Sequence, residues 1–213
     1  LIEEVARLVG YNNIPTTLPT VHMSYPEQDR DRQLRAQARE LLTAASYSEA
    51  INYSFTSTDH PQKMAIREGD SRLDLVKLLN PLNEDQAVMR SMLLPGLLEN
   101  VQRNASFQKT AVKLFELGKV FTPTGHDQQP IETTFIAGVL SGNRHGSSSS
   151  FHNKPEPVDL LDAKGAVEYL LDGLRLSAGA TDTTISFQVP DTDAAEPFSE
   201  PGQCLSIHDR DGA

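Results

Sequence analysis

The chain has 213 residues, a formal net charge of −10 and 38% hydrophobic residues, enough for the core of one large domain plus a fragment of another. The acidic balance argues against a surface that holds nucleic acid by bulk attraction, because that mode needs clustered lysine and arginine. Cys204 is the single cysteine, so an internal disulfide is excluded and a reducing compartment is expected. No apolar run approaches the roughly 20 residues of a membrane span. We therefore expect a cytoplasmic protein without membrane contact.

The N-terminal segment predicts a short helix followed by a linker. Ile2, Val5 and Val9 share one helical face, and Gly10 is placed to end the helix in a left-handed conformation. Thr and Pro are frequent after it and periodicity is absent, which predicts an extended linker over residues 16–28. The chain starts inside this helix without a methionine and ends in a turn, so we expect a piece of a longer polypeptide.

The remaining chain predicts long helices mixed with strands. Asp29 or Asp31 can cap a helix whose apolar positions are Leu34, Ala38, Leu41, Leu42 and Ala45. Further helices are expected over Leu93–Asn104 and Val158–Leu176, the latter with Leu160, Leu161 and Val167 on its buried side. Strands are predicted at Ser48–Phe55, Leu73–Leu79, Ala111–Phe121, Thr133–Ser141, Ile185–Val189 and Cys204–Ile207. Thr133–Ser141 is apolar enough to be a central strand. Without strict βαβ alternation, this order favours an α+β fold.

The most informative segment runs from Leu79 to Leu98. Asn80 and Pro81 end a strand, because proline has no amide proton and biases its predecessor to extended geometry. Polar groups for a turn or a helix cap follow at Asn83, Glu84 and Asp85. Pro95 fits the first turn of the next helix, where its missing N–H would be unpaired anyway. The segment therefore predicts a strand, a polar turn and a helix in fixed succession.

This segment closely resembles the β subunit of bacterial phenylalanine–tRNA ligase, in its catalytic-like domain. Asn80 to Leu98 match that family almost throughout, with Met92 where the family more often has serine. Leu1 to Pro15 resembles the last helix and exit strand of the family's preceding domain, and Lys113 to Phe121 gives a third match. The order and spacing of these segments agree over nearly the whole chain.

The resemblance implies a fold and a division into domains. It sharpens the α+β expectation to the class II synthetase fold, an antiparallel sheet flanked by helices, in a catalytically inactive version. It further implies that residues 1–15 are the C-terminal remnant of a preceding helical domain and that 16–28 form a linker. Residues 29–213 would then be a catalytic-like domain, truncated at its C-terminus.

Glu3 and Glu4 are the candidate metal ligands that the resemblance implies. The family has an Asp-x-x-Glu-Glu motif at this point, whose carboxylates help to bind a magnesium ion shared with the α subunit. The aspartate would fall just before Leu1, so the site would be incomplete in this chain. Mg²⁺ suits one or two carboxylates and several waters. The alternative is that both glutamates are solvated acids near a positive helix end.

Arg90 and the segment around Glu116 are the places where ATP chemistry would be sought. Active class II enzymes hold ATP phosphate with an arginine on a sheet strand, whereas Arg90 precedes a helix, so we expect it to pair with a carboxylate or to bond carbonyls. Lys113, Glu116 and Lys119 lie on the predicted strand near the second class II motif, and no arginine occurs between Ala105 and Gly142. We therefore assign no catalytic and no cofactor-binding residue.

The six histidines and the cysteine suggest no further chemistry. His22, His60, His126, His145, His152 and His208 lack metal-ligand spacing, so we expect each on the solvated surface. Cys204 has no histidine in a motif context, which favours a buried, inert thiol over a nucleophile.

Two classes of function follow. The favoured hypothesis is a non-catalytic structural module of phenylalanine–tRNA ligase, in which two α and two β chains join phenylalanine to its tRNA with ATP and Mg²⁺. The helix from Asp29 to Ala45 and the strand after it would pack against the α subunit. Four leucines contribute to that contact or fill this domain's own core: Leu93, Leu94, Leu97 and Leu98. The alternative is a free-standing, nucleotide-dependent enzyme that activates an amino acid. A nucleic-acid-binding domain is a third class, which the net charge disfavours.

Overall fold

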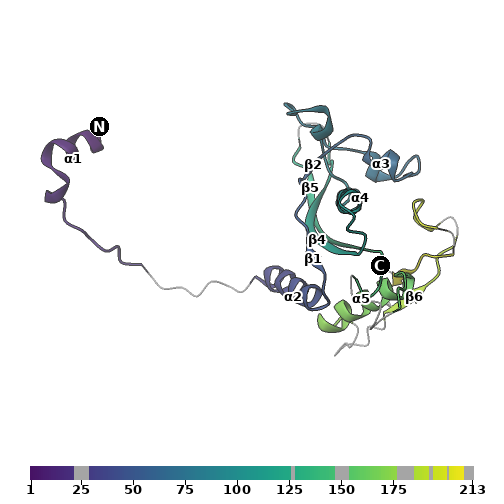
Figure 1. Ribbon diagram of the computed structural model, residues 1–213. Helices are drawn as coiled ribbons and strands as arrows, with labels where there is room; N and C mark the ends of the chain where they lie inside the picture. The colour runs from purple at the N-terminus through teal and green to yellow at the C-terminus, as the bar shows by residue number, and fades with distance from the viewer. Residues whose placement is uncertain are drawn as a thin grey trace. The chain divides into compact units, whose positions relative to one another are not determined.

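The structure is a computed structural model that describes residues 1–21, 29–125, 128–146, 154–176, 185–191, 194–200 and 202–208. It divides into two compact units, Leu1–Arg30 and Asp31–Ala213 (Figure 1). Within the described ranges, every helix is too short or too polar to span a bilayer. His22, His126 and His152 lie outside the described residues, as does most of the predicted linker.

The first unit contains helix α1 (Ile2–Val9) and a 3-10 turn at Tyr11–Asn13. Gly10 ends the helix with a φ of 90°, and its N–H donates to the Ala6 carbonyl. The predicted helix and its glycine stop are confirmed, although the ψ of 123° at Gly10 lies outside the left-handed helical region. The predicted apolar face is exposed throughout its length.

The second unit is built on a three-stranded sheet in the order β1-β4-β5. β1 (Ser48–Glu49) pairs in parallel with β4 (Val112–Thr122), and β4 pairs along its whole length, antiparallel, with β5 (Ile131–Ser141). The two long strands confirm the sequence prediction. The central strand is β4, however, not β5 as predicted, and most residues of β5 are exposed.

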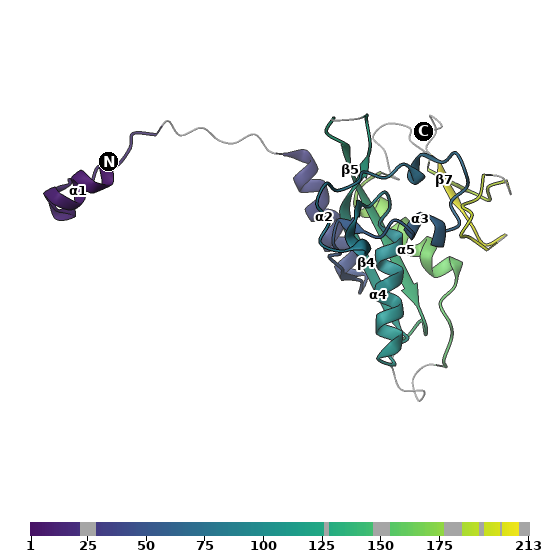
Figure 2. The ribbon, with the colours of Figure 1, turned by 90° about the horizontal axis from the view of Figure 1, so that it is seen from above.

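The two faces of β4 pack against different helices. Phe115 lies in a core cluster with Leu42 of α2 (Arg30–Ala44) and Tyr47, against which Leu170 of α5 (Leu160–Gly173) also packs. Successive side chains of a strand point to opposite faces, so Glu116 faces the side that α4 (Leu94–Ser106) covers. Figure 2 shows α4 running beside β4 and β5. The sheet with helices on both faces confirms the α+β class.

The remaining strands are short. β2 (Phe55–Thr56) pairs antiparallel with β3 (Val88–Met89), and β6 (Ser186–Gln188) pairs with β7 (Ser206–His208). The predicted continuous strand Ser48–Phe55 is therefore wrong, because the chain leaves one sheet after β1 and joins another at β2. The predicted strand Leu73–Leu79 is wrong as well. It makes one isolated bridge, from Lys77 to Val88, because its neighbour β3 is only two residues long.

Helix α5 begins at a capping box. The Asp159 side chain accepts hydrogen bonds from the Leu161 and Asp162 N–H groups, and the Asp162 carboxylate accepts from the Asp159 N–H. That backbone hydrogen bond is the largest cause of the lowered pKa of Asp162. Leu161 is 71% exposed, so the predicted burial of Leu161 is wrong. As the second residue of the helix, it precedes the turns that pack on the sheet.

Arg72 links the short 3-10 turn Ser71–Leu73 to the C-terminal part of the unit through an ion pair. The Arg72 guanidinium lies 2.7 Å from Asp70 and 2.9 Å from Glu196. The Asp70 carboxylate also accepts the Arg72 backbone N–H. These bonds, the Arg72 side chain first among them, lower the pKa of Asp70 from its ordinary value of 3.8 to about 2.

The lowered pKa predicts a pH dependence of stability. The carboxylate of Asp70 stabilises the fold above pH 3.8, and the effect is lost as the pH falls from there through about 2. Asp70→Asn should flatten the fall in unfolding free energy over this window, measured by urea denaturation. Asp74→Asn, an exposed neighbour, is the control and should keep the wild-type slope. Equal slopes for the wild type and Asp70→Asn would contradict the assignment.

Candidate functional site

The turn before α4 places Arg90 between three segments of the chain. Its N–H donates to the Ser54 carbonyl at 2.9 Å, and its carbonyl accepts from the Phe121 N–H at 3.0 Å. Its side-chain Nε donates to the Lys119 carbonyl at 2.8 Å. The backbone of Arg90 therefore joins β3 to the chain before β2 and to the end of β4, while its side chain turns back along β4.

A buried carboxylate receives the Arg90 guanidinium. Arg90 Nη1 lies 2.5 Å from Glu116 Oε1, and Glu116 is only 3% exposed. Asn52 adds two donors: its Nδ2 lies 2.7 Å from Glu116 Oε2, and its backbone N lies 3.3 Å from Oε1. This confirms the prediction that Arg90 pairs with a carboxylate or bonds a carbonyl, since it does both. Because both side chains are buried, removal of either one leaves the other as an unpaired buried charge and lowers the stability of the fold strongly.

Gly118 makes room for this arrangement. A Cβ at this position would overlap the Arg90 guanidinium and would also lie 3.3 Å from Glu116 Oε1. Gly118 faces the same side of β4 as Glu116 because the two are separated by two residues. Any larger residue would therefore move the arginine away from its carboxylate.

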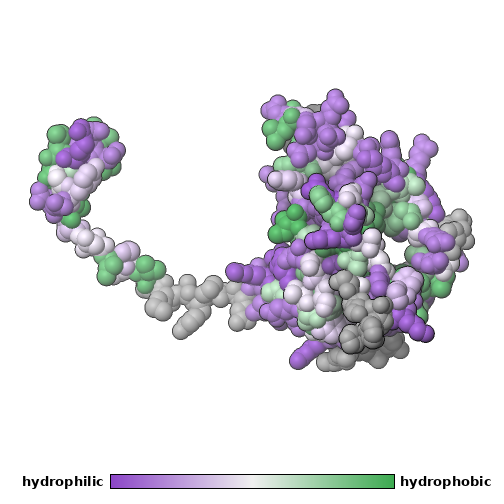
Figure 3. Space-filling model, viewed as in Figure 1, coloured by the Kyte–Doolittle hydropathy of each residue, from purple (hydrophilic) through white to green (hydrophobic). Residues whose placement is uncertain are grey.

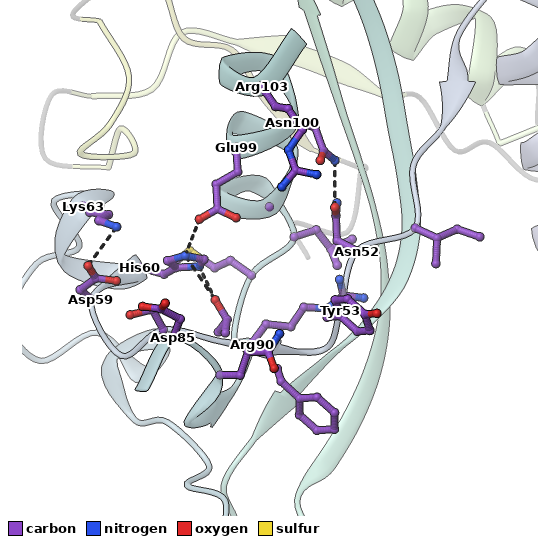
Figure 4. A pocket seen from close by; sticks show the side chains of 18 residues that line it. Asn52, Tyr53, Asp59, His60, Lys63, Asp85, Arg90, Glu99, Asn100 and Arg103 are labelled. Carbon is purple, nitrogen blue, oxygen red and sulfur yellow. Dashed lines mark hydrogen bonds and ion pairs between the residues drawn. The ribbon is translucent and has the colours of Figure 1, made fainter. Parts of the chain in front are cut away.

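A pocket of about 620 Å³ opens beside the pair (Figure 4). Arg90 and Asn52 form part of its wall, and α4 supplies Glu99, Asn100 and Arg103. The Asn100 side chain donates to Asn52 Oδ1 at 2.9 Å. This bond holds the Asn52 side chain with its amide nitrogen toward Glu116.

A histidine joins the opposite walls of the pocket. His60, in α3 (His60–Lys63), has Nδ1 2.5 Å from Thr56 Oγ1 and Nε2 2.9 Å from Glu99. Its side chain is only 13% exposed, so the prediction that His60 is a solvated surface residue is wrong. On the same short helix, Lys63 lies 2.9 Å from Asp59, and hydrogen bonding to Asp59 raises the pKa of Lys63.

The leucines of the following helix divide between core and surface. Leu93 and Leu97 are buried, the latter at 0% exposure, whereas Leu98 is exposed. Leu93 and Leu97 therefore fill this domain's own core. Cys204 is a free, half-buried thiol, less enclosed than predicted.

Glu3 and Glu4 lie in the first turn of α1. Glu4 accepts a 2.6 Å hydrogen bond from Arg7, and both glutamates are exposed. In the described part of the chain, no group of three or more His, Cys, Asp or Glu side chains is placed to hold a metal ion. Two neighbouring carboxylates fit part of a hydrated magnesium site but do not make one alone.

Sequence reasoning noticed Arg90 and Glu116 separately but missed Asn52, His60 and Gly118 as members of one network. Asn52 is 64 residues from Glu116 in the chain, and nothing in the local pattern announces the contact. The available signals were an arginine followed by a helix start and a glycine two residues after a strand glutamate.

The second unit has the fold of a class II aminoacyl-tRNA synthetase. A structure of pyrrolysyl-tRNA synthetase from Desulfitobacterium hafniense matches 76% of this chain and 50% of its own, with a TM-score of 0.51 and 13% sequence identity. A second structure of a pyrrolysyl-tRNA synthetase from this organism matches with a TM-score of 0.50 and 15% identity, covering 74% and 50% of the two chains. At these identities the likeness concerns the fold alone.

Sequence comparison identifies the family. Residues 14–211 match the family described as the phenylalanyl tRNA synthetase beta chain CLM domain, and the chain belongs to that family. The phenylalanine–tRNA ligase beta subunit of Desulfotalea psychrophila is 53% identical over 98% of this chain and 26% of its own length. That of Geobacter metallireducens is 35% identical over 97% of this chain and 24% of its own. The chain thus spans about a quarter of the length of these relatives.

The role of Gly118 can be tested by adding one methyl group. Gly118→Ala should displace the Arg90 side chain and lower the free energy of unfolding by about 2–4 kcal/mol, the cost of disturbing a buried ion pair. Gly138→Ala is the matched control on the partner strand, since its Cβ would meet only the Leu114 carbonyl at an ordinary 3.6 Å. Denaturation in guanidinium chloride measures both. An equal loss of unfolding free energy in the Gly118→Ala and Gly138→Ala variants would show that displacing the Arg90 side chain does not destabilise the fold.

Proposed function

We propose that this chain is a non-catalytic structural module of the β subunit of phenylalanine–tRNA ligase. In this role it supports the α subunit, which attaches phenylalanine to its tRNA at the expense of ATP. The observation that carries the proposal is the buried Arg90–Glu116 pair. An arginine that holds ATP phosphate must donate hydrogen bonds from its guanidinium to the phosphate. In Arg90, Nη1 already donates to the Glu116 carboxylate and Nε to the Lys119 carbonyl.

Exposed apolar residues on the second unit are evidence for an interface with a partner protein. After β1, the chain leaves the sheet and exposes alternate residues: Ile51 is 90% exposed, Tyr53 is 78% exposed, and Phe55 is also exposed. We call these three residues the apolar strip. They follow α2, the helix expected to pack on the α subunit. Figure 3 shows that the hydrophilic surface of this unit is interrupted by hydrophobic groups, and exposed apolar residues that occur together mark interaction sites.

The wider assembly completes the proposal. It has two α and two β chains, acts in the cytoplasm and binds tRNA as a whole. Residues 1–15 are the end of a preceding domain, 16–28 are a linker, and 29–213 form most of the catalytic-like domain. Glu3 and Glu4 contribute carboxylates to a magnesium ion whose other ligands come from outside this chain, and Mg²⁺ keeps several waters in such sites.

The apolar strip predicts the effect of a charge on assembly. Ile51→Glu should weaken capture of a phenylalanine–tRNA ligase α subunit at least about tenfold, because a charge would be buried without a partner at the interface. Affinity is measured by pull-down and by titration of the purified chains. Leu161→Glu, at an exposed leucine on α5, is the control and should bind as the wild type does. Unchanged binding by Ile51→Glu would remove the strip from the interface.

ATP–pyrophosphate exchange distinguishes the module from the alternative, a free-standing amino-acid-activating enzyme. The module predicts no exchange, and the enzyme predicts exchange. The chain alone should show no ATP–pyrophosphate exchange with any amino acid in the presence of Mg²⁺, because the guanidinium beside the pocket is bound internally. An active class II synthetase serves as the positive control. Exchange above background by the isolated chain would support the enzyme and contradict the module.

A further inference from the structure

The Glu116 carboxylate accepts hydrogen bonds from three donors that converge on it. Arg90 Nη1 and the Asn52 backbone N–H reach Oε1, and Asn52 Nδ2 reaches Oε2, at 2.5, 3.3 and 2.7 Å. A guanidinium, a backbone N–H and an amide N–H converging on two oxygens form an arrangement suited to a planar carboxylate. In this protein the carboxylate belongs to the chain itself.

The donors are held in place by bonds that do not involve Glu116. Arg90 Nε is fixed by the Lys119 carbonyl, and the Arg90 backbone by Ser54 and Phe121. Asn52 is fixed by the Asn100 side chain. A Cβ on Gly96 of α4 would lie 3.3 Å from the Asn52 side chain, so the helix also packs closely against it. Loss of the carboxylate would therefore leave its donors oriented.

The two residues that supply the donors border an open pocket. Asn52 and Arg90 both line the pocket of about 620 Å³, and Figure 4 shows their side chains from the pocket side. With the Glu116 carboxylate removed, this opening is the side from which a small anion would reach the space that the carboxylate leaves. Its charge would replace the one that neutralises Arg90 in the native protein.

We propose that Asn52 and Arg90 form a binding site for small carboxylate anions, which Glu116 occupies as an internal ligand. The site is closed in the native chain and becomes available when the Glu116 side chain is shortened. The proposal concerns the chemistry of this chain alone and does not depend on its role in an assembly.

The test uses Glu116→Ala, which removes the internal carboxylate and leaves the donors. Sodium acetate should raise the melting temperature of this variant saturably, by about 3 °C or more relative to sodium chloride at equal ionic strength and neutral pH. The wild type should show no such difference. Glu132→Ala removes an exposed carboxylate that pairs with Lys119 and is the matched control, with no response expected.

Two comparisons separate anion binding from other effects. Acetamide, neutral and of the same size, should not stabilise Glu116→Ala, so equal stabilisation by acetamide would overturn the proposal in favour of simple cavity filling. Glu116→Gln keeps the space filled and should also lack an acetate response. If Glu116→Ala is unfolded in chloride, acetate should restore its circular dichroism spectrum. A variant that acetate neither stabilises nor refolds would contradict the proposal.

Discussion

A buried positive charge is the constraint on which the second unit depends. The Arg90 side chain is only 9% exposed beside β4, and its neutralisation requires an acid in one position on the sheet. Glu116 supplies that acid, Gly118 leaves the space, and Asn52 donates two further hydrogen bonds to the carboxylate. Three segments far apart in the chain are therefore fixed relative to one another by a single ion pair and its hydrogen bonds.

In the proposed function, the same pair distinguishes this domain from an active enzyme with the class II fold. A class II fold can bring an arginine to a sheet face for phosphate, but here the guanidinium faces the carboxylate of Glu116 on β4. The pocket beside it is bridged by His60 between Thr56 and Glu99. These contacts stabilise the fold through internal pairs. The exposed apolar strip on the same domain agrees with the proposed role as a structural support for a catalytic subunit.

The long elements of this fold could be predicted from sequence, and the short ones could not. α2, α4, α5, β4 and β5 have apolar periodicities long enough to read. β1 and β2 have two residues each, and the alternation of residues 51–55 predicts one continuous strand where the chain changes sheet between Glu49 and Phe55. That change depends on a side-chain contact with Glu116, which is a tertiary event.

One contact of the site could be predicted from the local sequence, and the others could not. The pairing of Arg90 with a carboxylate was predictable because an arginine before a helix, without a strand to present it, needs an acid or a carbonyl. Its partner was not, since Glu116 is 26 residues away in the chain and nothing in the local pattern of β4 shows that its side chain faces Arg90. The sequence predicts a surface position for His60 because it lacks metal-ligand spacing, whereas the side chain bonds Thr56 and, 39 residues away, Glu99.

A double-mutant cycle at Arg90 and Glu116 measures the central interaction most directly. Arg90→Met and Glu116→Gln, alone and together, give the coupling free energy between the two side chains from unfolding in denaturant. We expect a coupling of at least about 2 kcal/mol, with the double variant more stable than the sum of the two single losses implies, because neither charge is then left alone. A coupling near zero would contradict an account in which this pair organises the domain.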